Sequence, residues 1–84
     1  MAELVRLPKH LGEVLRWYRR KQNLTQAELA KRTGLRQGTI SQVESGLETV
    51  KVSTIMCILA ALDLELIVQT RTKGSHEDIE AAFT

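Results

Sequence analysis

The chain has 84 residues with a net charge of +2, few aromatic residues, one cysteine and two isolated histidines. This length predicts one domain with a modest aliphatic core, which favours oligomerisation. A single cysteine excludes an internal disulfide, and we expect no metal, no cofactor, no signal peptide and no membrane span, so a cytoplasmic protein is predicted.

Two helical patterns occupy the first half of the chain. Apolar residues at helical spacing predict a first helix over about 9–21. Thr25 and Glu28 form a T-x-x-E capping box, which predicts a second helix over about 26–33. Gly34 follows it, at the position where a left-handed residue commonly ends a helix.

Two more helices are predicted in the next thirty residues. A short helix is expected over 37–44, where Ile40 and Val43 are three residues apart and face inward. Residues 52–62 repeat the amphipathic pattern and predict a fourth helix, with Val52 among its core-facing side chains.

The hydrophobic period changes after residue 63. Residues 64–71 alternate in the manner of a strand, and the run Leu66-Ile67-Val68 disfavours the alternative of a fifth helix. A lone strand leaves its backbone groups unpaired, so we expect it to pair with the same strand of a second copy. The residues expected to form this dimer contact are Leu64, Leu66, Ile67 and Val68.

The residues after this strand are polar and acidic. Such a composition predicts a flexible tail that does not join a packed core. The chain is therefore predicted to consist of one domain over 1–71 and a tail over 72–84.

The stretch TQAELAKRTGLRQGTISQVESG closely resembles the helix-turn-helix of the phage-repressor-like (Xre/Cro) family. It combines a cap, a turn glycine, core spacing and a polar face in one register. The matching positions are Thr25, Gln26, Leu29, Ala30, Gly34, Leu35, Thr39, Ile40, Ser41, Glu44 and Gly46. The resemblance implies a mainly α, lambda-repressor-like four-helix domain. The alternation over 64–71 adds the prediction of a C-terminal strand, which pairs in an intermolecular β-sheet of a homodimer.

One face of the third predicted helix carries the expected DNA contacts. Gln37 and Ser41, and Gly38 and Gln42, are each four apart, so they share the side opposite the core. Glutamine pairs bidentately with adenine in the major groove, and Arg36 can take guanine or a phosphate. The expected DNA-binding residues are Gln26, Arg36, Gln37, Gly38, Thr39, Ser41 and Gln42.

The family resemblance implies further roles. It implies that Gln26 contacts a phosphate and that Arg19 and Glu44 form an internal, structural ion pair. Thr39 is a candidate phosphate donor, with a local hydrogen bond at the helix start as the alternative. Gly38 departs from the family, where a side chain is usual. It either allows the backbone to approach DNA closely or occupies a position that has lost its base contact.

The four-helix body, terminal strand and polar tail together resemble the HipB antitoxin subfamily. That resemblance implies a repressor that autoregulates its operon and binds a HipA-like serine/threonine kinase toxin. Residues 1–51 carry ten basic and five acidic side chains, which suits a polyanionic partner. A homodimer would present two recognition helices to a pseudo-palindromic operator in double-stranded DNA.

Other function classes compete with this interpretation. The alternatives are a stand-alone phage-type repressor and a protein-interaction module that no longer reads DNA. An enzyme is disfavoured because the sequence offers no nucleophile–base pair, no phosphate-binding glycine loop and no metal set. We therefore expect neither a small-molecule substrate nor a membrane partner.

Overall fold

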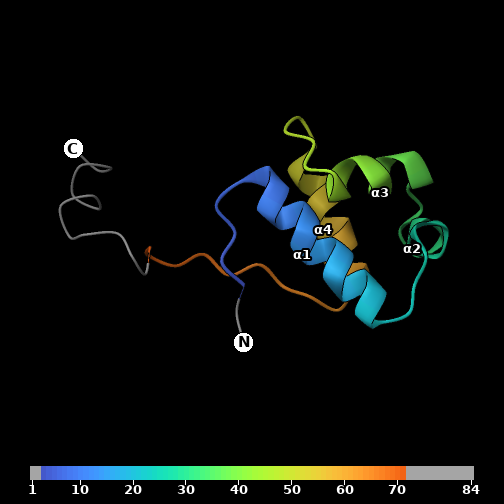
Figure 1. Cartoon of the computed structure of the whole chain (residues 1–84), viewed down its shortest axis with the longest axis horizontal. Helices are drawn as coiled ribbons and strands as arrows, with labels where there is room; N and C mark the ends of the chain where they lie inside the picture. The colour runs from blue at the N-terminus through green and yellow to red at the C-terminus, as the bar shows by residue number, and fades with distance from the viewer. Residues whose placement is uncertain (1–2, 72–84) are drawn as a thin grey trace.

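The computed structural model describes residues 3–71, and over this range the chain forms four helices (Figure 1). They are α1 (Pro8–Lys21), α2 (Gln26–Thr33), α3 (Gln37–Glu44) and α4 (Val52–Ala61). The four predicted helices are thus confirmed, with bounds that differ by about one residue. The predicted flexible tail over 72–84 lies outside the described residues.

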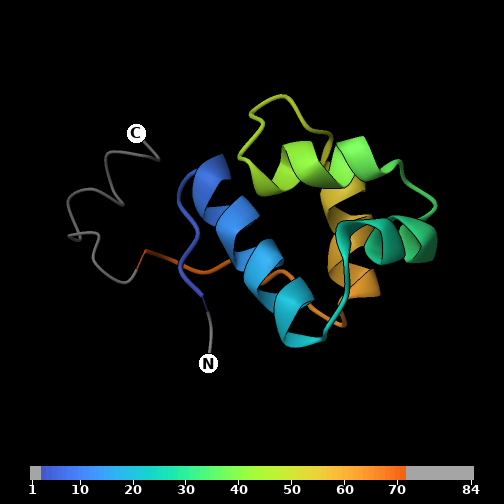
Figure 2. The ribbon, with the colours of Figure 1, turned by 45° about the vertical axis from the view of Figure 1, so that its right-hand side comes forward.

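The helices pack around one aliphatic core. α1 packs against α3, α3 against α2, and α2 against α4, which lies behind the α2–α3 pair in Figure 2. Burial of an aliphatic side chain of this size stabilises a fold by about 1.5–3 kcal/mol. The side chains that are almost fully buried are Leu15, Leu29, Ile40, Ile58 and Leu62.

The prediction for Val52 was wrong. Its side chain is 71% exposed, although it fits the apolar spacing of α4. Val52 is the first residue of that helix and lies at the edge of the core, whereas Ile55, one turn later, is buried.

Three of the helices end in the same way. A residue with a left-handed backbone is followed by a leucine, whose amide donates to the carbonyl five residues earlier. This is the hydrogen bond of a Schellman motif, and it satisfies a carbonyl that the helix leaves free. The pairs are Asn23-Leu24 after α1, Gly46-Leu47 after α3 and Asp63-Leu64 after α4.

The predicted strand over 64–71 is not present in the single chain, and neither is a fifth helix. Leu64 instead belongs to the end of α4, because its amide donates to the Leu59 carbonyl at 2.8 Å and its side chain packs on the core. The following apolar residues are uncovered, with Ile67 68% and Val68 91% exposed. A strand needs a neighbour for its ladder, and the described residues 3–71 supply none to residues 64–71.

A close crossing of α1 and α3 depends on Gly12. A Cβ atom at this position would lie 2.5 Å from the Val43 carbonyl oxygen and 2.7 Å from that of Glu44. Glycine costs about 1 kcal/mol within a helix relative to alanine, so a buried helical glycine commonly has a packing reason. The apolar spacing of α1 does not reveal the role of this residue, and a glycine among helix-forming neighbours is the one local signal for it.

Candidate nucleic-acid interface

The turn between α2 and α3 is fixed by local contacts. Gly34 ends α2 with φ = 74°, the left-handed conformation expected from the sequence. The Thr33 hydroxyl donates to the Leu29 carbonyl at 2.9 Å and accepts from the Leu35 amide at 3.2 Å. Leu35 then packs against the core. The direction in which α3 leaves the turn is therefore determined by both backbone and packing.

α3 has one buried face and one exposed face. Ile40 and Val43 point into the core, as predicted. The opposite side brings together most of the residues expected to contact DNA. Thr39 and Ser41 are half-buried there, and the exposed positions are Arg36, Gln37, Gly38 and Gln42.

The first turn of α3 is open. Arg36 precedes the helix with an extended backbone, and its side chain makes no capping hydrogen bond. A Cβ atom at Gly38 would meet no other atom of residues 3–71 within 4 Å. No contact within residues 3–71 therefore requires glycine there.

The start of α2 is capped on both sides. The Glu28 amide donates to the Thr25 hydroxyl and the Thr25 amide donates to the Glu28 carboxylate, each at 3.0 Å. These hydrogen bonds lower the pKa of Glu28 below its ordinary value. The capping box inferred from the sequence is present and fixes the first turn of α2.

Arg19 and Glu44 form a bidentate ion pair. Arg19 Nε lies 2.6 Å from Glu44 Oε2, and Nη2 lies 2.9 Å from Oε1. The two side chains are only 8% and 5% exposed. Arg19 Nη1 also donates to the Leu24 carbonyl at 2.6 Å, and the hydrogen bond with Glu44 raises the pKa of Arg19. The pair therefore ties α1 to the end of α3.

Gln26, the first residue of α2, makes a contact that the sequence did not indicate. Its Nε2 lies 3.2 Å from Glu44 Oε1. The two residues are 18 positions apart, so no local pattern predicts their approach. Three helices thus meet at one polar cluster, formed by Arg19, Gln26 and Glu44.

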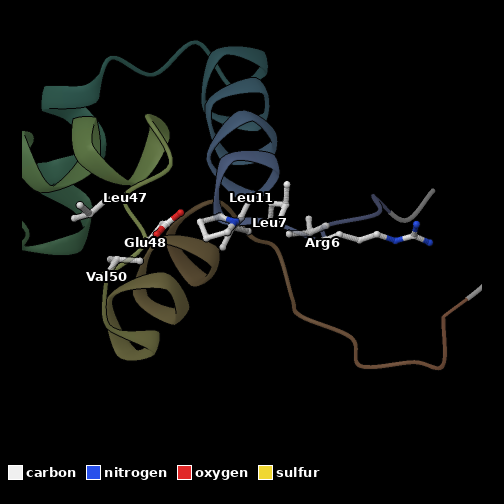
Figure 3. Close-up of a pocket in the computed structure, with 8 residues that line it drawn as sticks. Arg6, Leu7, Leu11, Leu47, Glu48 and Val50 are labelled. Carbon is white, nitrogen blue, oxygen red and sulfur yellow. The ribbon is translucent and has the colours of Figure 1, made fainter. Parts of the chain in front are cut away.

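An open pocket of about 300 Å³ lies elsewhere, between the N-terminal segment, the start of α1 and the loop after α3 (Figure 3). Leu7, Leu11, Leu47 and Val50 give it a largely apolar lining. None of the predicted DNA-binding residues lines this pocket. Within residues 3–71, no group of three metal-binding side chains occurs. The same range holds no helix of the length and apolar character that a membrane crossing needs.

Known proteins share both this sequence and this arrangement. The helix-turn-helix family model matches residues 15–68. Antitoxin HipB of Escherichia coli strain K12 is 32% identical over 73 residues, which are 87% of this chain and 83% of HipB. A HipB variant in complex with an O2 20mer superposes with a TM-score of 0.78 at 30% identity, covering 83% of this chain and 97% of that one.

A second solved structure contains a further protein. A HipA-HipB-O2-O3 complex matches with a TM-score of 0.77 at 30% identity, covering 86% of this chain and all of the matched chain. The family model covers more than half of the chain, and the resemblance inferred from Thr25 to Gly46 is confirmed. The chain therefore belongs to the helix-turn-helix family of DNA-binding regulators that includes the antitoxin HipB.

Proposed function

We propose that this protein is a sequence-specific DNA-binding repressor that acts as a homodimer and as the antitoxin of a HipA-like kinase. The observation that carries the proposal is the exposed face of α3. Gln37 and Gln42 are exposed to solvent there, and the side chain of Arg36 does not cap the first turn of the helix. A glutamine amide donates and accepts together, which matches the major-groove edge of adenine. Each good bidentate contact discriminates between bases by about 1–3 kcal/mol.

The proposed contacts divide into two kinds. Gln37 and Gln42 read bases, and Arg36 takes guanine or a phosphate. The phosphate-binding residues are proposed to be Gln26, Thr39 and Ser41, which set the register on DNA without reading its sequence. Gly38, which no contact among the described residues 3–71 explains, is proposed to let the backbone of α3 approach the bases.

The uncovered segment after α4 supports the proposed dimer. Pairing with the same segment of a second copy would give its backbone a ladder and cover its apolar side chains. The residues assigned to this contact are the exposed Leu66, Ile67 and Val68, together with Leu64, which borders them and already packs on the core. We assign DNA binding and dimerisation to residues 1–71 and the cytoplasm as the compartment. Two recognition helices one DNA turn apart, about 34 Å, would match a pseudo-palindromic operator.

The antitoxin role rests on the relatives. HipB occurs in a complex with HipA, and the HipB-like match in that complex spans 86% of this chain. The proposed partner is accordingly a HipA-like serine/threonine kinase, and the proposed target is the operator of the protein's own operon.

Fluorescence anisotropy tests the proposed function. The full chain is titrated against a duplex from upstream of its own gene, with random duplex as the competitor, at two salt concentrations. Specific binding that exceeds random binding by about 10³-fold or more, with a steep dependence on salt, is the expected result. Equal affinity for both duplexes would refute sequence-specific repression, and binding of a HipA-like kinase without DNA binding would favour an interaction module.

Three variants locate the binding face. Gln37→Ala should reduce the preference for the operator, because it removes a base contact. If Arg36 touches phosphate, Arg36→Ala should weaken binding to all sequences and reduce the salt slope by about 1. Arg20→Ala removes the same charge from an exposed position on α1. It should leave the operator preference and the salt slope nearly unchanged. A uniform effect of all three substitutions would contradict the assignment to α3.

A further inference from the structure

The polar cluster of Arg19, Gln26 and Glu44 joins three helix termini. Glu44 is the last residue of α3, Gln26 is the first residue of α2, and Arg19 lies in the last turn of α1. Glu44 Oε1 receives both Arg19 Nη2 at 2.9 Å and Gln26 Nε2 at 3.2 Å. The Glu44 carboxylate is therefore the shared acceptor that links the start of α2 to the end of α3.

This contact orients the Gln26 amide. An ionised carboxylate can only accept hydrogen bonds, so the nitrogen of the amide must face Glu44 and its oxygen must face away. The amide nitrogen carries two hydrogens, and the contact with Glu44 uses one of them. The second hydrogen stays available to donate to an acceptor such as a phosphate oxygen.

Arg19 makes a carboxylate at this position compatible with DNA. A bare negative charge next to a phosphate would repel it, whereas the bidentate guanidinium compensates the charge of Glu44. The side chains of Arg19 and Glu44 are almost buried, so solvent and salt screen their interaction little. The Gln26 amide is therefore held by an ion pair with no net charge, whose two side chains are fixed in place.

We propose that Glu44 is a positioning residue for DNA binding, which acts by holding the Gln26 amide in the orientation that donates to a DNA phosphate. The inference rests on the proposed function, because it assumes that Gln26 contacts DNA. It goes beyond a structural ion pair, because Glu44 then contributes to DNA affinity through a residue on another helix. A side chain fixed before binding loses less conformational freedom when the complex forms.

A double-mutant cycle on DNA affinity tests this role. Gln26→Ala is made in the wild-type chain and in Glu44→Gln, and each protein is titrated with the operator duplex at a temperature where thermal melts show it folded. We expect Gln26→Ala to weaken binding about tenfold in the wild-type background and less than about threefold in the Glu44→Gln background. An equal loss in both backgrounds would overturn the proposal, even if Glu44→Gln lowers the melting temperature.

Gln37→Ala provides the matched control in the same two backgrounds. Gln37 begins α3 at the end remote from Glu44, so its loss should cost the same factor in both. If that factor also falls, Glu44→Gln disturbs α3 as a whole and specific positioning of Gln26 is refuted.

Random duplex separates this proposal from the proposed function. A phosphate contact is independent of sequence, so the same cycle applies to random DNA. Loss of operator preference with coupling retained would refute specific repression and leave the role of Glu44 standing. Operator preference without coupling between Gln26 and Glu44 would support specific repression and overturn the role of Glu44. A chain that binds no DNA would overturn both proposals.

Side-chain dynamics supply a measurement that needs no variant. In the free wild-type protein, the side-chain amide of Gln26 should show restricted motion in NMR relaxation, while the exposed amide of Gln42 should be mobile. On addition of duplex, the Gln26 amide signals should shift while their motion stays restricted. An amide of Gln26 as mobile as that of Gln42 in the free protein would overturn the proposal.

Discussion

Replacement of Gly12 by alanine should destabilise the fold although alanine is the better helix former. The added Cβ would lie 2.5 Å from the Val43 carbonyl oxygen, while ordinary van der Waals contacts begin at 3.4 Å. Helices α1 and α3 would therefore have to separate by about 0.9 Å at their crossing, because the obstructing atoms belong to the backbone and cannot rotate away.

The expected change in the free energy of unfolding is the balance of two opposing effects. Overpacking a well-packed interior typically costs about 1–3 kcal/mol, and an obstruction by backbone places Gly12→Ala near the upper limit. The gain in helix propensity from alanine is about 1 kcal/mol. The net expectation is a loss of about 2 kcal/mol, which lowers the melting temperature of a domain of this size by roughly 8–16 °C.

Gly38→Ala is the matched control. It is the same substitution within a helix, but the new Cβ meets no atom of the described part of the chain within 4 Å. Only the propensity effect remains, so this variant should melt about 4–8 °C above the wild type. Thermal circular dichroism at equal protomer concentration measures both, because the melting temperature of the proposed dimer would depend on concentration. Shifts of the same sign for the two variants would refute the reasoning from close approach.

Three further perturbations test the cap, the ion pair and the dimer. Thr25→Ala should lower the free energy of unfolding by about 1 kcal/mol in urea titrations. The folded-state pKa of Glu28 is lowered, so the ionised carboxylate stabilises the fold fully above its unfolded pKa of about 4.3. This contribution to the free energy of unfolding is lost as the pH falls through the folded-state pKa. Glu28→Gln should therefore show a smaller loss of melting temperature on acidification than the wild type. Arg19→Lys, which cannot keep the bidentate contact, should cost about 1–3 kcal/mol of unfolding free energy. Val68→Asp should shift sedimentation toward monomer; an unchanged distribution, or an equal shift in Gln69→Glu, would count against the proposed dimer contact.

Local signals made much of this fold predictable. The Thr25–Glu28 box and Gly34 each depend on hydrogen bonds or dihedral angles within a few residues, and the structure contains both features where the sequence indicated them. The inward faces of α1 and α3 were predictable for the same reason, since the 3.6-residue period alone identifies Leu15 and Ile40.

Features that depend on distant residues were not predictable. Gly12 in isolation indicates a weaker helix, and its role becomes clear only when α3 crosses it. The contact between Gln26 and Glu44 joins two helices through tertiary packing. The run around Ile67 has the composition of a strand, but a ladder is a property of two segments, and the part of the chain that the structure describes provides only one.

The uncovered apolar residues after α4 would make repression of the proposed operon depend steeply on the abundance of this protein. If the chain must pair through this segment before it fills an operator, occupancy at low abundance rises with the square of protomer concentration. Repression would then set in over a narrow range of abundance. The surface around Val68, through the strength of its pairing, would set the abundance at which that threshold lies.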